Sequence, residues 1–191
     1  MATKPGERRT QILETLAGML EQPRAARITT AALAARLQLS EAALYRHFAS
    51  KAQMYESLIE FIETTIFTLV NQIAATEPQG LGRARRIAAM LLSFSERNRG
   101  MTRLLTGDAL VTEDSRLQER INHINDRIEA SFRQALRSAV DDGGLHRDAD
   151  VAAHASLLTH LVLGRWLRYT QSGWRVAPTG HLDEQLRLVL G

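Results

Sequence analysis

The chain of 191 residues contains no cysteine and only four prolines, at positions 5, 23, 78 and 178. Without cysteine there can be no disulfide framework and no thiolate chemistry. No run of apolar residues approaches the roughly 18 that a membrane span requires, and the N-terminus lacks the apolar segment of a signal peptide. We therefore expect a cytoplasmic protein without a membrane partner.

The chain also lacks the sequence motifs that catalysts commonly use. It has no glycine-rich phosphate loop, no G-x-S-x-G elbow and no H-E-x-x-H pair. The six histidines, at positions 47, 123, 146, 154, 160 and 181, do not pair four residues apart on a helix. Asp141 and Asp142 could suggest a metal site, but the two glycines that follow them are more typical of a helix end. We therefore expect no enzyme activity, no metal site and no cofactor.

What the sequence does contain is a helical spacing of apolar residues over most of its length, without the alternation typical of strands. Helices are predicted at about residues 7–21, 51–75, 83–98, 99–106, 117–139, 149–171 and 181–190. The apolar face of the 51–75 helix comprises Met54, Leu58, Phe61, Ile62, Ile66, Leu69 and Ile73. That of the 117–139 helix comprises Leu117, Ile121, Ile124, Ile128, Phe132, Ala135 and Ala139. The expected fold class is all-α, with a three-helix domain at residues 1–51 and a helical domain at residues 52–191.

Two further, short helices are predicted between Ile28 and Lys51, in the sequence ITTAALAARLQLSEAALYRHFASK. Thr29 or Thr30 is expected to cap the first and Ser40 the second, because their hydroxyls accept hydrogen bonds from free backbone amides. The apolar stripe of the first helix comprises Ala31, Leu33, Ala34 and Leu37.

The second of these short helices has an anchoring side and an open side. Leu44 and Phe48 share one face and would hold the helix against the core. The open side carries Ala42, Ala43, Tyr45 and Arg46. Alanines on an exposed face let a helix lie close to base edges in the major groove, where a methyl can meet a thymine methyl. DNA binding is the favoured interpretation, and an ordinary helical hairpin is the alternative.

The charge distribution favours the same interpretation. Residues 1–51 contain eight basic and four acidic side chains, whereas the remainder contains 16 basic and 17 acidic ones. The basic excess therefore coincides with the helix pair, as contact with phosphates requires. Ser50 and Gln53 form a capping box that opens the next helix and places Lys51 where a phosphate would lie.

Arginines are concentrated in residues 83–103, where six of them accompany one acidic residue, Glu96. Arg83, Arg86 and Arg97 fall on one broad helical face. This face could form a groove for an acidic peptide, because guanidinium groups bind carboxylates well. Alternatively, it is a solvated face, salt-bridged to the acidic helix before it. The candidate partner site comprises Phe61, Met90, Ser93, Arg97 and Asn98.

The two C-terminal helices carry more apolar surface than one contact face requires. Their apolar residues could be ordinary core, but a four-helix bundle across a two-fold axis is favoured, because a helix-turn-helix protein that binds two half-sites needs a dimer. The residues expected in this dimer interface are Leu158, Leu161, Val162, Leu182 and Leu186.

The layout resembles the TetR family, in which an N-terminal three-helix DNA-binding domain precedes a helical domain for dimerisation and sensing. The DNA-binding domain of this chain ends with the sequence LYRHFASK. Three longer segments resemble the SlmA subfamily of nucleoid occlusion factors, namely SEAALYRHFASKAQMYESLIEFIE, FSERNRGMTRLLTGDAL and RLQERINHINDRIEASFRQALR. Ser93 and Arg99 depart from the glycine and proline of that subfamily's G-F-x-E-R-N-P-G pattern.

The resemblance implies a homodimer that binds palindromic double-stranded DNA and, when bound, antagonises polymers of the tubulin-like division protein FtsZ. Such a protein would be cytoplasmic and nucleoid-associated, without a small-molecule substrate. Thr29 and His47 are expected, by resemblance, to touch phosphates. The full DNA-binding set is Thr29, Thr30, Ser40, Glu41, Ala42, Ala43, Tyr45, Arg46, His47 and Lys51. The alternative is a TetR-type transcriptional repressor that a small apolar ligand releases from DNA.

Overall fold

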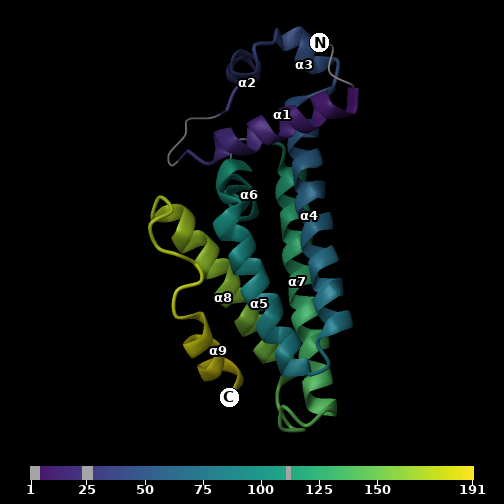
Figure 1. The fold of residues 1–191 in the computed structure, drawn as a ribbon, viewed down its shortest axis with the longest axis vertical. Coiled ribbons are helices and arrows are strands. Elements are labelled where there is room, and N and C mark those ends of the chain that lie inside the picture. Colours follow the sequence, from purple (N-terminus) through teal and green to yellow (C-terminus); the bar gives the residue numbers. More distant parts are fainter. Residues whose placement is uncertain (1–4, 23–27, 111–112) are drawn as a thin grey trace.

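The computed structural model describes residues 5–22, 28–110 and 113–191, and these residues form helices and connecting turns without a strand (Figure 1). The elements are α1 (Pro5–Leu20), α2 (Thr30–Leu37), α3 (Glu41–Tyr45), α4 (Lys51–Thr76), α5 (Gly80–Arg97), α6 (Arg99–Leu105), the 3-10 turn η1 (Asp108–Leu110), α7 (Ser115–Asp141), α8 (Val151–Gln171) and α9 (Leu182–Leu190). The all-α fold class is confirmed.

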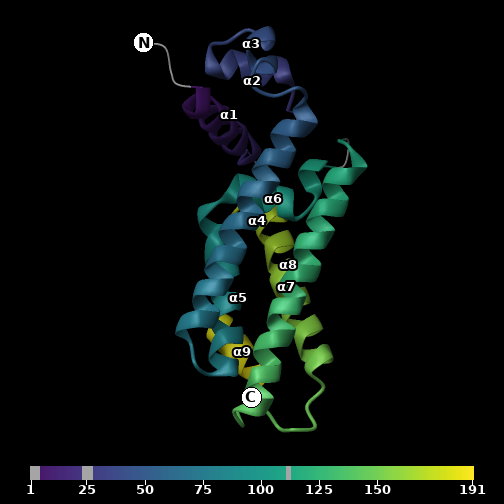
Figure 2. The ribbon, with the colours of Figure 1, turned by 90° about the vertical axis from the view of Figure 1, so that its right-hand side faces the viewer.

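Four long helices, α4, α5, α7 and α8, run along the longest axis of the molecule (Figures 1 and 2). α1 lies across one end of this group and packs on α4 and α6. α2 and α3 lie beyond α1, at the tip of the molecule. We call α1–α3 the reader and the remaining helices the body.

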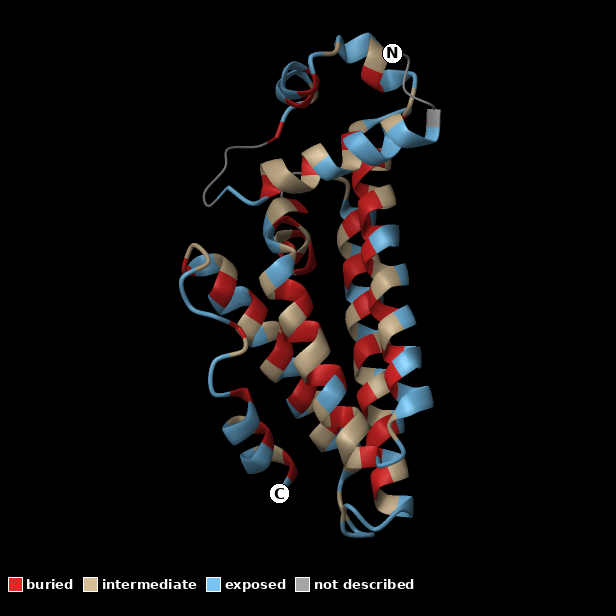
Figure 3. Cartoon of the chain, in the orientation of Figure 1, coloured by how far each residue is buried: buried red, intermediate tan, exposed pale blue. Residues whose placement is uncertain are grey.

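The long helix α7 shows what holds the body together. The seven residues that the sequence pattern assigned to its apolar face, from Leu117 to Ala139, are all buried. α7 packs against α4, α5 and α8, and Figure 3 shows the buried sides of these helices turned toward one another. Burying one large aliphatic or aromatic side chain contributes about 1.5–3 kcal/mol, so these contacts fix the arrangement of the body.

Two residues assigned to apolar stripes are exposed instead. Phe61 of α4 is 53% exposed, although Leu58 and Ile62 beside it are buried. The assignment was wrong because Phe61 lies about 100° around the helix from Ile62, on the flank of the stripe. Ala31 of α2 is also exposed, and only Leu33, Ala34 and Leu37 form that helix's buried side.

Among the described helices, α4 alone is long and apolar enough to cross a membrane by composition. Most of its large apolar side chains, among them Leu58, Ile62 and Ile66, are buried against neighbouring helices of the body, with Phe61 as the exposed exception. Its composition is therefore explained by a position in the protein core.

The helix α8 is apolar on two sides, and the structure identifies the inner one. Leu158 and Val162 of α8, together with Leu182 and Leu186 of α9, are buried within the single chain. Because these four residues pack against their own body, their side chains leave little surface for the dimer interface in which the sequence placed them. Only Leu161, which is half-buried, lies toward the outer side.

Candidate nucleic-acid interface

Helix α3 has the predicted anchoring and open sides. Leu44, and Phe48 in the turn after the helix, are buried. Ala42, Tyr45 and the C-cap residue Arg46 are exposed, Tyr45 to 46%, and Ala43 is half-buried. The open side therefore presents a small side chain beside an aromatic ring and a guanidinium group. A surface of this kind can approach base edges closely.

Hydroxyl caps determine where α2 and α3 begin. Thr29 Oγ1 and Ser40 Oγ each accept a hydrogen bond from the backbone amide three residues on, at 3.1 and 3.2 Å. Thr30 Oγ1 donates to Glu41 Oε2 at 2.5 Å, which joins the start of α2 to the start of α3. These four residues of the predicted DNA-binding set thus shape the helix pair itself.

Arg9 also contributes to this surface, although the sequence showed it only as one of the basic residues of the segment 1–51. Its Cζ lies 4.1 Å from the centroid of the Phe48 ring, and its guanidinium donates to the carbonyl of His47. Arg9 therefore joins α1 to the turn after α3, where His47 is half-buried. The contact spans 38 residues, and no local pattern in the sequence indicates it.

Part of the basic excess of residues 1–51 can be placed on the molecule. Arg9, Arg36 and Arg46 are exposed on the reader. Lys4, Arg24 and Arg27 lie outside the described residues. Exposed basic groups on the reader are what attraction to a phosphate backbone requires.

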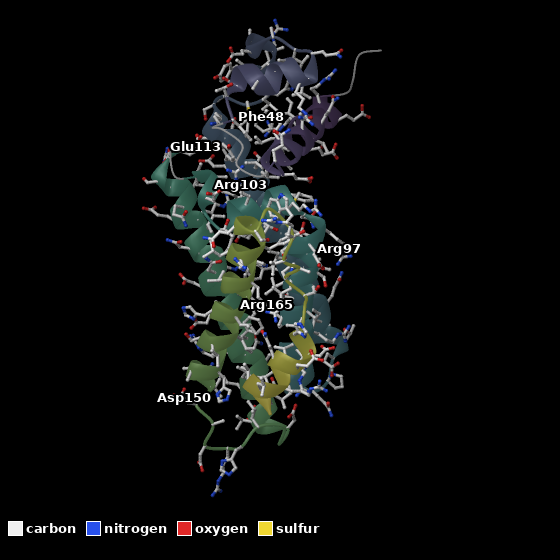
Figure 4. The ribbon with its side chains drawn as sticks, turned by 90° about the vertical axis from the view of Figure 1, so that its left-hand side faces the viewer. Phe48, Arg97, Arg103, Glu113, Asp150 and Arg165 are labelled. Carbon is white, nitrogen blue, oxygen red and sulfur yellow. The ribbon has the colours of Figure 1, made fainter. Side chains whose placement is uncertain are left out.

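The start of α4 is capped as predicted, with one difference. Ser50 Oγ accepts a hydrogen bond from Gln53 N at 3.1 Å, but Gln53 Oε1 accepts from Ala49 N rather than from Ser50 N. Lys51 Nζ, which was expected at a phosphate, lies 2.5 Å from Glu113 Oε1, and its side chain is 17% exposed. Figure 4 shows Glu113 near the junction of body and reader. A phosphate would therefore compete with Glu113 for this lysine.

The residue after Glu113 is Asp114, the N-cap of α7. Asp114 accepts hydrogen bonds from Arg116 N at 3.0 Å and from Arg116 Nη2 at 2.6 Å. These bonds, the side-chain one first, stabilise the ionised carboxylate and lower the pKa of Asp114 to about 2. The same pairing raises the pKa of Arg116 above its ordinary value.

A second surface feature, on the outside of the body, is a groove between α4 and α5. The α4 side of this groove is formed by Leu69, Gln72, Ile73 and Thr76. The α5 side is formed by Arg86, Ala89, Met90, Ser93 and Arg97. We call this feature the α4–α5 groove, and Figure 4 shows Arg97 at the surface of the body.

The five predicted partner residues are placed differently with respect to the groove. Met90, Ser93 and Arg97 line it. Phe61 is exposed on α4, two turns before the groove begins. Asn98 donates through Nδ2 to a carbonyl of α5 at 2.8 Å, and Arg97 donates through Nε to Ser93 O at 3.2 Å.

Two arginines of residues 83–103 contact Glu77, which caps the C-terminal end of α4, rather than the acidic residues within that helix. Arg83 Nε donates to the Glu77 carbonyl at 2.6 Å, and Arg86 Nη1 lies 3.5 Å from Glu77 Oε2. Glu63 of α4 pairs with Arg120 of α7 at 3.4 Å. Because Arg83 is held on the side of α7, only Arg86 and Arg97 of the predicted arginine face reach the groove.

Comparison with known proteins gives two family matches that together span most of the chain. Residues 12–58 match the bacterial regulatory proteins of the tetR family. Residues 78–190 match a SlmA-like domain described as a tetracyclin repressor-like C-terminal domain.

Individual relatives match over nearly their whole length. The nucleoid occlusion factor SlmA of Marinomonas sp. (strain MWYL1) is 47% identical over 97% of this chain and 94% of its own length. The nucleoid occlusion factor SlmA of Aliivibrio fischeri (strain MJ11) is also 47% identical, over 99% of this chain and 97% of its own length.

Solved structures with a similar fold share little sequence with this chain. The fatty acid degradation regulator FadR from Bacillus halodurans has a TM-score of 0.79 at 13% identity, covering 99% of this chain and 97% of its own. The regulator FadR from Bacillus subtilis in complex with stearoyl-CoA has a TM-score of 0.76 at 10% identity, covering 95% of this chain and 97% of its own. At these identities the likeness concerns the fold alone.

Proposed function

This chain belongs to the TetR family and, within it, to the SlmA group of nucleoid occlusion factors, and from that premise we propose how it acts. As a homodimer it binds palindromic chromosomal DNA through residues 1–51. When bound to DNA, it antagonises FtsZ polymers through residues 52–191, so that the division septum does not assemble over the nucleoid. The α4–α5 groove carries this proposal, because three of the predicted partner residues line it.

In this proposal the open side of α3 enters the major groove. Ala42 and Ala43 approach base edges, where larger side chains would hold the helix away. Tyr45 and Arg46 flank them, and Arg46 supplies a cation for the backbone. The capping residues Thr29 and Ser40 begin their helices at the same surface, where free backbone amides favour phosphate.

The dimer is proposed to form through the outer side of α8. Leu157 is 52% exposed there, and Leu161 and Gly164 follow on the same helical face at intervals of four and three residues. Gly164 has open space around the position where a Cβ would lie. A stripe of this kind lets the α8 helices of two protomers approach closely across a two-fold axis.

The α4–α5 groove is proposed to bind the acidic and apolar C-terminal tail of FtsZ. Met90 and Ile73 offer apolar contacts, and Arg86 and Arg97 offer guanidinium groups to carboxylates on an extended peptide. Phe61, exposed further along α4, extends the apolar surface beyond the groove.

A TetR-type repressor released by a small apolar ligand is the second candidate. Such a protein needs an apolar cavity inside its C-terminal domain. In this chain the large side chains of Trp166 and Phe132 are fully buried in the body. The feature that matches the predicted site is instead a groove on the outside, which favours a macromolecular partner.

Charge reversal at Arg97 tests the partner assignment. Arg97→Asp should abolish FtsZ antagonism, because it places a carboxylate where an acidic peptide would bind, and it should leave DNA affinity unchanged. Antagonism is measured by light scattering of FtsZ polymers in the presence of the cognate duplex, and DNA affinity by fluorescence anisotropy.

Arg147→Asp is the matched control, since Arg147 is exposed in the turn between α7 and α8, away from the groove. This variant should behave as wild type in both assays. If Arg97→Asp antagonises FtsZ as well as Arg147→Asp does, the groove is not the partner site and the ligand-released repressor becomes the better account.

A further inference from the structure

The C-terminal end of α1 meets two hydrogen-bond donors from the body. Trp174 Nε1, in the turn after α8, donates to Glu21 O at 2.7 Å. Arg103 Nη1, on α6, donates to Gln22 O at 3.2 Å. Both carbonyls belong to the two residues that directly follow α1, and the body supplies a hydrogen-bond donor to each of them. Figure 4 shows Arg103 at the end of the body that faces the reader.

The same end of α1 is also in close backbone contact with α6. A Cβ at Gly100 would lie 2.0 Å from Ala17 O and 3.2 Å from the Cβ of Leu20. Only a residue without a side chain allows this approach. The last turn of α1 is therefore held by α6, and the residues that directly follow it are held by α6 and by the turn after α8.

The backbone at Trp174 adopts an unusual conformation that directs its ring toward α1. Its φ of +67° lies in the left-handed region, which residues other than glycine rarely adopt. The conformation is supported by a hydrogen bond from Trp174 N to Tyr169 O at 3.0 Å and by an edge-on contact between the two rings, 4.9 Å between centroids. Tyr169 is in turn held by Arg99 Nε, which donates to its hydroxyl at 3.1 Å. Unfavourable backbone geometry persists where its surroundings over-determine it, often at functional positions.

The open side of α3 lies at the far tip of the reader, whereas Trp174 and Arg103 act at the reader's attachment to the body (Figure 1). A small rotation of α1 at this attachment is therefore amplified into a displacement of α3. Two recognition helices of a dimer can occupy both half-sites of a palindrome only if their separation matches the half-site spacing.

We propose that Trp174 and Arg103 are positioning residues that fix the angle of the reader on the body and thereby select the half-site spacing that the dimer binds. The inference rests on the proposed function, because it requires a dimer that reads a palindrome. It assigns the selectivity for half-site spacing to the turn after α8 and to α6, both of which belong to the body and not to the reader.

The test compares Trp174→Phe with Trp166→Phe. Both changes remove one indole N–H, but that of Trp166 is buried without a hydrogen-bond partner among the described residues. Affinities are measured for the palindromic duplex that the wild-type protein selects from random DNA, for duplexes with the half-sites moved apart by one or two base pairs, and for a single half-site. The ratio of the affinity for the selected spacing to the affinity for the altered spacings should fall about fivefold in Trp174→Phe, as expected for the loss of one hydrogen bond. Single-half-site affinity should stay unchanged.

Arg103→Gln provides an independent variant, which removes the second donor and should weaken the spacing preference in the same direction. An unchanged spacing preference in Trp174→Phe and Arg103→Gln would overturn the inference, as would an equal loss in Trp166→Phe. Failure of the proposed function would look different, because the wild-type protein would then select no palindrome at all.

Discussion

Among single residues, Ala42 tests most directly whether α3 is the recognition helix. Ala42 is exposed on the open side of α3, where its methyl group allows close approach to DNA. Ala42→Glu should abolish specific DNA binding, because it places a carboxylate against the phosphates, while leaving the circular dichroism of the helices unchanged. Ala74→Glu, at an exposed position of α4 within the body, should bind normally. Normal binding by Ala42→Glu would mean that the recognition helix lies elsewhere.

Lys51 is the residue for which sequence and structure give different partners. If it leaves Glu113 to bind a phosphate, Lys51→Gln should weaken cognate and scrambled DNA about equally and reduce the salt slope by about one. Glu113→Gln should then leave binding unchanged or tighter, because it removes the competing carboxylate. Equal weakening by both substitutions would show that the ion pair serves only to hold the segment before α7 beside the start of α4.

At the scale of secondary-structure elements, the sequence predicted most of the helices and several of their caps. The apolar face of α7 was predicted correctly because the opposite face of that helix is strongly polar. Ser40 and Ser50 were predicted as caps, and Thr29 as one of two candidates with Thr30, because capping is a local property that depends on the residues that follow.

The sequence could not predict which side of α8 faces inward, because both sides are apolar and periodicity alone does not distinguish them. Contacts across long sequence separations were also missed, as in the Lys51–Glu113 pair, 62 residues apart. The α5 side of the groove could be predicted in part, since Met90, Ser93 and Arg97 share one side of α5 at helical spacing.

The start of α7 gives a prediction on pH. Because the pKa of Asp114 is lowered from 3.8 to about 2 in the folded protein, its contribution to stability is present above pH 4 and is lost as the pH falls toward 2. An NMR titration of the Asp114 carboxyl group should show the low pKa in the wild-type protein. In Arg116→Gln the pKa should rise toward the ordinary value, since the main hydrogen-bond donor is lost. A wild-type Asp114 that titrates near pH 4 would contradict this account of the cap.

At the scale of the whole molecule, the two sides of α8 should respond differently to substitution. Leu161→Glu, on the outer side, should yield monomers with near-normal thermal stability that bind a palindrome weakly, because it places a charge in the proposed dimer interface. Leu158→Ala, on the inner side, should lower the free energy of unfolding by about 2–5 kcal/mol, because it creates a cavity, while the protein stays dimeric. Analytical ultracentrifugation and thermal melting measure the two effects. A stable Leu161→Glu dimer would move the interface away from this side of α8.

The central claim is that DNA binding and FtsZ antagonism are linked functions of one dimer. The most direct measurement is co-sedimentation of this protein with FtsZ polymers, with and without the palindromic duplex that it selects. We expect the amount of sedimented FtsZ polymer to fall in the presence of protein and palindromic duplex together, and to change little with protein alone or with a scrambled duplex. FtsZ polymers that sediment equally under all of these conditions would contradict the account.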